Sequence, residues 1–210
     1  MRTPWTWVAA VALSCVAAPA LSQDFGQFGP APPIAPNTHA FGTYVTGGEN
    51  ALGLLAQLRL SFMPNVDFGF QGGLNRIDAD DRDHNAVRMG ADVKFGVAHA
   101  SESFPVDVSL GGAIGVQTGD RLTILSLGPS AVASHGFAIN PNNTITPYGG
   151  FLLRFTSTDL GSSTDTNFDL ALRLGGDFHI GPDFGVLGEV QFNDDSGGSV
   201  GFSTGLNITF

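Results

Sequence analysis

Asp177 and His179 are the residues whose types and spacing come nearest to a catalytic pair in this chain. On a β-strand, residues two apart share a face, and a carboxylate beside an imidazole can act as a general base. Glu189 would lie on the adjoining strand. The sequence marks no nucleophile, phosphate loop, nucleophile elbow or metal–thiol motif. We therefore expect an interior salt-bridge network here, with no catalytic residue and no cofactor.

A second cluster of functional groups is acidic. Asp78, Asp80, Asp81 and Asp83 lie close together in the polar segment 78–85. Hard cations such as Ca²⁺ take several carboxylate oxygens, but this segment lacks the glycine turn and the distal glutamate of an EF-hand loop. We expect a solvated acidic loop and no metal site.

The elements that would position these residues are strands, because apolar and polar residues alternate from His39 onward. Period-two alternation indicates a strand with two different faces. In residues 122–134 the alternation of Leu122, Ile124, Leu125 and Leu127 changes phase around Ser126, which predicts a bulge. The pattern predicts ten strands, at 39–47, 52–62, 66–76, 86–98, 106–118, 122–134, 144–156, 167–180, 184–193 and 200–210. Eight strands are the alternative, if 39–47 and 122–134 do not pair.

If these strands close into a barrel, the composition of their polar face indicates which face points inward. It is rich in glycine, which suits a crowded, curved interior better than a solvated surface. It also carries five basic and six acidic residues, and charges in a narrow lumen must pair. The apolar face should therefore point outward, into lipid. The expected lumen network is Arg59, Asp67, Arg88, Asp92, Lys94, Asp107, Arg154, Asp169, Arg173, Asp177, His179 and Glu189.

The last strand carries a more specific signal. Ser203, Gly205, Ile208 and Phe210 give a polar residue, a glycine, an apolar residue and a terminal aromatic. This pattern resembles the C-terminal assembly signal of bacterial outer-membrane β-barrels. The resemblance implies an outer-membrane location, and the barrel-assembly machinery as a partner during insertion.

The N-terminal end has a different composition. Residues 1–22 are typical of a secretory signal peptide, with Arg2, a short apolar stretch and a small-residue cleavage site. Cys15, the only cysteine of the chain, lies within it. Residues 23–37 are rich in proline and glycine, which predicts an extended periplasmic segment leading into a barrel domain at 38–210.

These observations predict an antiparallel up-and-down transmembrane β-barrel with a largely occluded, charged lumen. We expect a structural or surface-interaction role through acidic extracellular loops; a narrow porin-like channel and an outer-membrane enzyme are the alternatives. The bilayer and lipopolysaccharide are the expected partners, and a monomer is favoured. A net charge of −10 argues against nucleic acid.

Overall fold

A computed structural model describes residues 28–48, 51–79, 82–119, 122–159, 164–194 and 199–210. The regular elements of these residues are all strands. They are β1 (His39–Gly48), β2 (Ala51–Met63), β3 (Val66–Ala79), β4 (Arg82–Ala98), β5 (Asp107–Gly119), β6 (Leu122–Ser134), β7 (Phe137–Asn140), β8 (Asn143–Asp159), β9 (Thr164–Ile180), β10 (Phe184–Asn193) and β11 (Ser199–Thr209). The signal-peptide prediction at 1–22 lies outside the described residues.

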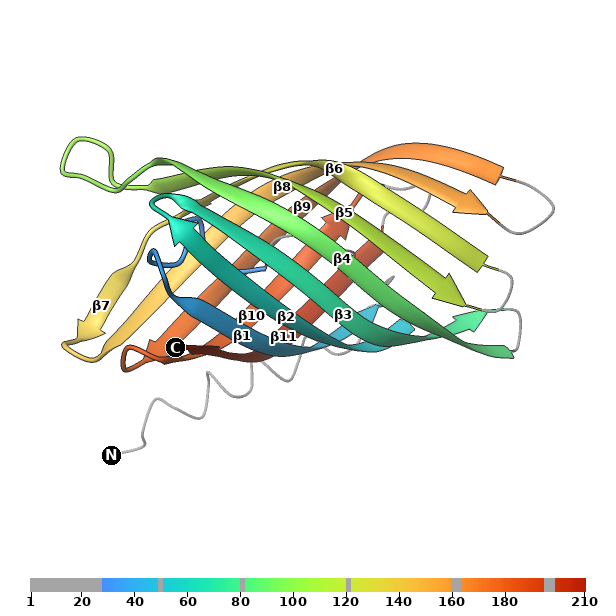
Figure 1. Cartoon of the computed structure of the whole chain (residues 1–210), viewed down its shortest axis with the longest axis horizontal. Helices are drawn as coiled ribbons and strands as arrows, with labels where there is room; N and C mark the ends of the chain where they lie inside the picture. The colour runs from blue at the N-terminus through green and yellow to red at the C-terminus, as the bar shows by residue number, and fades with distance from the viewer. Residues whose placement is uncertain (1–27, 49–50, 80–81, 120–121, 160–163, 195–198) are drawn as a thin grey trace, which may run out of the picture.

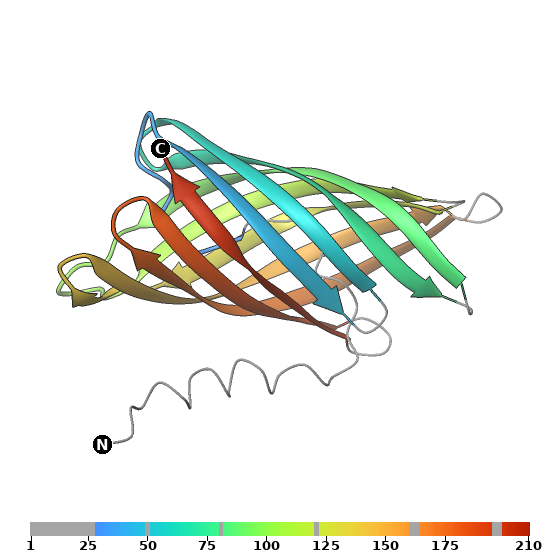
Figure 2. The ribbon, with the colours of Figure 1, turned by 90° about the horizontal axis from the view of Figure 1, so that it is seen from below.

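The strands close into a barrel of ten (Figures 1 and 2). Each strand from β1 to β5 pairs antiparallel with the next, and so does each strand from β8 to β10. β6 pairs with β8, and β11 pairs with β1. The ten predicted strands are therefore confirmed, and the eight-strand alternative is wrong. Across the described ranges, no helix is long and apolar enough to span a membrane.

β7 is the element that the sequence did not predict. It lies within the 135–143 connection and pairs only with the start of β8. Its four residues are all exposed. In Figure 1 the resulting hairpin projects at the end of the barrel where β1 begins and β11 ends, which we call the Phe210 end.

The predicted bulge in 122–134 is wrong. β6 keeps one register with β5 along its whole length, and one register with β8 on both sides of Gly128 and Pro129. Those two residues make no pair with β8, and proline has no N–H to donate. Leu125 and Leu127 point outward and Ser126 points inward, so inward and outward side chains alternate without a break. Ile124 is then an apolar residue on the inner face, which is why the sequence pattern suggested a change of phase.

The two faces of the wall have the predicted orientation. Leu54 and Leu74 are 64% and 62% exposed on the outer face, whereas Arg88 and Asp67 are 1% and 0% exposed on the inner face. An apolar exterior around a buried polar interior is the reverse of a soluble barrel.

The predicted acidic loop is shorter than expected. β3 continues to Ala79 and β4 begins at Arg82, so Asp78 and Asp83 are paired strand residues. Asp80 and Asp81 lie outside the described residues. The two strands extend as one hairpin at the end opposite the Phe210 end, as do β8 and β9 (Figure 1).

Candidate functional site

The lumen contains a cluster of charged side chains centred on Arg59. Its guanidinium contacts Asp67, and its Nη2 donates to Asp92 Oδ1 at 2.8 Å. Lys94 Nζ lies 3.7 Å from Asp67 Oδ2. These four groups come from β2, β3 and β4 and are nearly inaccessible to solvent. Opposite charges thus compensate one another where water is excluded.

A second part of the network lies on β8, β9 and β10. Arg154 Nη2 is 2.8 Å from Asp169 Oδ1, and Arg173 Nη1 is 4.0 Å from Glu189 Oε1. The Tyr148 hydroxyl donates to Glu189 Oε2 at 2.7 Å. Both halves of the barrel thus contain ion pairs between buried lumen side chains.

Three predicted members of the network have other surroundings. Arg88 Nη1 donates to the amide oxygen of Asn75 at 3.4 Å. Asp107 lies near the Phe210 end, where Oδ1 accepts the Ala100 N–H at 2.9 Å and is 3.8 Å from His99. His179, also near that end, has a side chain one-third exposed.

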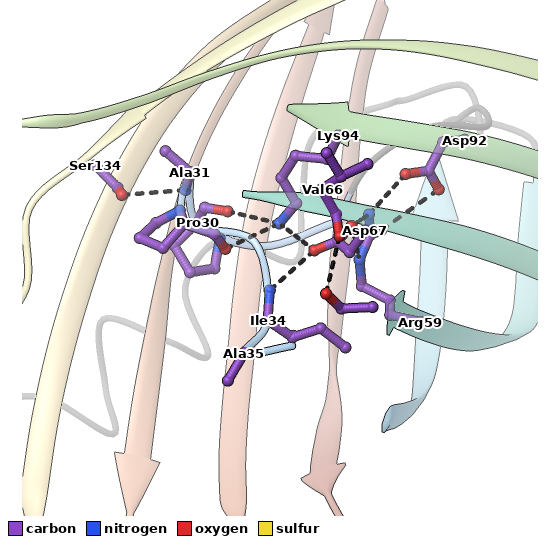
Figure 3. Close-up of polar contacts among 12 residues, drawn as sticks. Pro30, Ala31, Ile34, Ala35, Arg59, Val66, Asp67, Asp92, Lys94 and Ser134 are labelled. Atoms are coloured by element: carbon purple, nitrogen blue, oxygen red, sulfur yellow. Dashed lines mark hydrogen bonds and ion pairs between the residues drawn. The ribbon is translucent and has the colours of Figure 1, made fainter. Parts of the chain in front are cut away.

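The main difference from the sequence prediction is the N-terminal segment. We expected residues 23–37 to lie in the periplasm, but residues 28–34, the plug segment, lie inside the barrel (Figure 3). Phe28 and Ala31 are 3% and 0% exposed. The Phe28 ring stacks on Tyr44 of β1 with centroids 4.9 Å apart. Residues 23–27 lie outside the described part of the chain.

Specific hydrogen bonds hold the plug segment. Lys94 Nζ donates to the carbonyls of Pro30 and Pro32, at 3.1 and 3.2 Å. The Ile34 N–H donates to Asp67 Oδ2 at 3.0 Å, and the Ala31 N–H donates to Ser134 Oγ at 3.1 Å. Prolines explain why a lysine is needed: they contribute carbonyl acceptors but no donors, so the segment cannot satisfy its own acceptors.

A cavity of about 220 Å³ remains between the plug segment and the wall. Its polar lining includes Tyr44, Gln57, Asp177, His179 and Asn207. His179 Nε2 lies 3.0 Å from Asp177 Oδ2, so the pair expected from the sequence is formed. The described residues contain no group of three or more His, Cys, Asp or Glu side chains arranged to hold a metal ion.

The architecture agrees in kind with solved structures of bacterial barrels. The chain is similar to the β domain of the Bordetella autotransporter BrkA (9% identity, 81% of this chain and 97% of that one, TM-score 0.48). It is also similar to the N-terminal β-barrel domain of Pseudomonas aeruginosa OprF (7%, 83% and 98%, 0.36) and to Ail of Yersinia pestis (13%, 82% and 95%, 0.31). No family model and no curated protein matches the sequence.

A closed wall that is apolar outside and ion-paired inside is the deciding observation. The chain has the fold of a small transmembrane β-barrel. Its exposed belt of leucine, valine, isoleucine and phenylalanine fits a wall in contact with lipid, as the predicted outer-membrane location requires.

The predicted assembly signal of this outer-membrane barrel occupies the closing seam. β11 pairs with β1 from Ala40 with Thr209 to Gly47 with Phe202. Ser203 faces inward and is buried, whereas Ile208 and Phe210 are 49% and 67% exposed on the outside. Recognition of these residues by assembly machinery remains a prediction.

Sequence reasoning missed the residues that contact the plug segment, Tyr44 and Ser134. One signal was available: Lys94 is the only lysine of the chain and lies on the inner face. A buried lysine needs acceptors for three donors, and a proline-rich stretch elsewhere in the sequence supplies carbonyls.

Proposed function

We propose that this outer-membrane barrel is a non-enzymatic, structural or surface-interaction protein whose lumen is occluded. The observation that carries the proposal is the plug segment, which lies where a conducting path would have to run. Phe28 and Ala31 are buried against the wall, and Lys94 and Asp67 fix the backbone between them and β1.

The width of the barrel supports occlusion. Barrels of about eight strands are just wide enough for side chains to fill them, and ten strands give a barrel only about a quarter wider. Here long side chains such as Arg59, Arg88 and Arg173 enter the lumen from several strands and are almost completely buried.

The surface-interaction role rests on the end opposite the Phe210 end, which we expect to face the outside of the cell. Asp159 and Asp165 are exposed on the β8–β9 hairpin, and Asp194 is exposed where β10 ends. Acidic residues at this level favour a basic partner, or lipopolysaccharide phosphates bridged by divalent cations.

Single-channel recording in planar bilayers tests occlusion. The mature chain is expected to show no stepwise conductance, whereas a chain lacking residues 23–36 should conduct because the path is cleared. Stepwise conductance by the intact mature chain would support the porin-like alternative and contradict the proposal. As a control, circular dichroism should show the same strand content for both chains.

Loop trimming tests the surface role separately. Replacing residues 157–166, which include Asp159 and Asp165, by a two-residue turn should abolish partner or lipopolysaccharide binding while the barrel still folds. Retained binding would contradict a role for this hairpin. Turnover of an outer-membrane substrate that disappears in a His179→Gln variant would instead support the enzyme alternative.

A further inference from the structure

Asp177 differs from every other buried carboxylate of the lumen in its ionic partner. Asp67, Asp92, Asp169 and Glu189 each lie within 4.0 Å of an arginine or a lysine. Asp177, whose side chain is 5% exposed, has only His179 within that distance among the described residues. An imidazole carries a full charge only when it is protonated.

The carboxylate of Asp177 is also incompletely hydrogen-bonded. Oδ2 contacts His179 Nε2 at 3.0 Å, whereas Oδ1 is buried and accepts no hydrogen bond. A buried charge without a compensating charge is strongly unfavourable. Rotation about the terminal carboxyl torsion is easy, so either oxygen can face the space beside it.

That space is the cavity of about 220 Å³ at the plug segment, equal to the share of roughly seven water molecules in the liquid. Arg59 and Lys94 also line it, but their charges are met by Asp67 and Asp92. Asp177 is therefore the carboxylate of the cavity lining that has a histidine, and no arginine or lysine, within 4.0 Å in the described part of the chain.

A second buried group in the lining lacks a partner. Gln57 is 2% exposed, and its Nε2 donates no hydrogen bond. A ligand that satisfied both groups would carry a cationic donor for Asp177 and an oxygen acceptor for Gln57. A small amino alcohol has both functions and fits the volume.

We propose that this cavity is a binding site for a small solute with a primary ammonium group and a neighbouring hydroxyl oxygen, with Asp177 as its counter-ion. His179 lies beside Asp177 and is partly exposed near the Phe210 end, so the solute would enter from that end. The inference goes beyond the structural role proposed above, because a sealed barrel needs no solute site.

Isothermal titration calorimetry on the folded mature chain in detergent tests this proposal, with ethanolamine as the probe. Ethylene glycol is the matched neutral probe, because it replaces the ammonium with a hydroxyl. We expect saturable binding of ethanolamine and none of ethylene glycol. The Asp177→Asn variant should weaken ethanolamine binding roughly tenfold or more, as loss of a charged hydrogen bond does.

Two further variants make the result specific. Asp107→Asn is the matched control, because Asp107 also faces a histidine near the Phe210 end but does not line the cavity; it should bind normally. Ala40→Phe should abolish binding by filling the cavity, and it decides the matter if Asp177→Asn fails to fold.

The proposal is overturned if the mature chain shows no saturable binding, or if it binds ethylene glycol as well as ethanolamine. It is equally overturned if Asp177→Asn and Ala40→Phe both bind like the parent chain. None of these results would bear on occlusion, which is measured by conductance.

Discussion

Arg59 on β2 and Asp92 on β4 bond to each other directly over Gly69 on β3. The three residues are in register, Arg59 with Gly69 and Gly69 with Asp92. Because glycine has no side chain, the guanidinium can pass over the intervening strand and donate to Asp92 Oδ1 at 2.8 Å. The ion pair thus connects strands that are not neighbours, and it stiffens this part of the wall from the inside.

Gly69→Ala should destabilise the barrel by about 1–3 kcal/mol, since overpacking a tight interior forces side chains to shift. An added Cβ would overlap the Asp92 carboxylate and press on Arg59. Gly72→Ala is the matched control on the same strand, because nothing lies within 4 Å of its Cβ position. Urea titration in lipid vesicles measures both free energies of unfolding. Equal effects of the two substitutions would contradict the role given to Gly69.

Arg59→Met should cost about 3–5 kcal/mol, because it removes one partner of a buried ion pair and leaves carboxylates uncompensated. Asp67 would retain Lys94, but Asp92 would lose its ionic partner. Arg76→Met, at an exposed position of β3, should change the free energy of unfolding by less than about 0.5 kcal/mol. A small loss for Arg59→Met would mean that water already solvates these carboxylates.

Lys94→Met should release the plug segment, because two charged hydrogen bonds to Pro30 and Pro32 are lost. The readout is thiol labelling of Ala31→Cys, which would be the only cysteine after signal-peptide removal. With Lys94 in place this thiol should be protected, and Lys94→Met should accelerate its labelling roughly 10- to 100-fold. Ser103→Cys, in an exposed connection, should label quickly in both backgrounds. An unchanged rate at position 31 would show that Lys94 does not hold the segment.

Arginine substitutions on the outer face should report depth in the bilayer. Met89 lies near the middle of β4 and is 55% exposed, so Met89→Arg should cost about 2–4 kcal/mol. Phe62, near the Phe210 end of β2, is equally accessible, and Phe62→Arg should cost only about 0–1 kcal/mol near the interface. Unfolding in vesicles gives both values. A larger loss of stability for Phe62→Arg than for Met89→Arg would show that Met89 does not lie at the middle of the bilayer.

Phe210→Ala should separate assembly from stability. The backbone groups of Phe210 and His39 exchange two hydrogen bonds, at 2.8 and 2.9 Å, and alanine preserves both. We expect less folded protein in the outer membrane of cells, while refolded protein loses no more than about 1–2 kcal/mol. Normal cellular levels would argue against an assembly signal at this terminus.

The strands were predictable from sequence because each has one face in contact with lipid and one in contact with a polar interior. That difference produces a period-two pattern that is readable without tertiary information. The lumen ion pairs were predictable as a set, since the charged residues share a face. Their individual pairing was not, because Arg59 reaches across β3 only where Gly69 lets it pass.

The plug segment could not be predicted in the same way. Proline fixes the backbone but gives no periodic pattern. Its partners Asp67, Lys94 and Ser134 lie 33 to 103 residues away in sequence and come from three different strands. β7 was missed because its four residues are too few to show a pattern and are exposed on both faces.

The position of the plug segment also constrains the order of events during assembly. Its neighbours come from both halves of the chain: Tyr44, Asp67, Lys94, Ser134 and Leu187. These side chains surround one segment only after the β1–β11 and β6–β8 contacts have formed. Although it is synthesised before any strand, the segment therefore acquires its complete environment last. The moment at which it becomes resistant to protease would mark the moment at which the barrel closes.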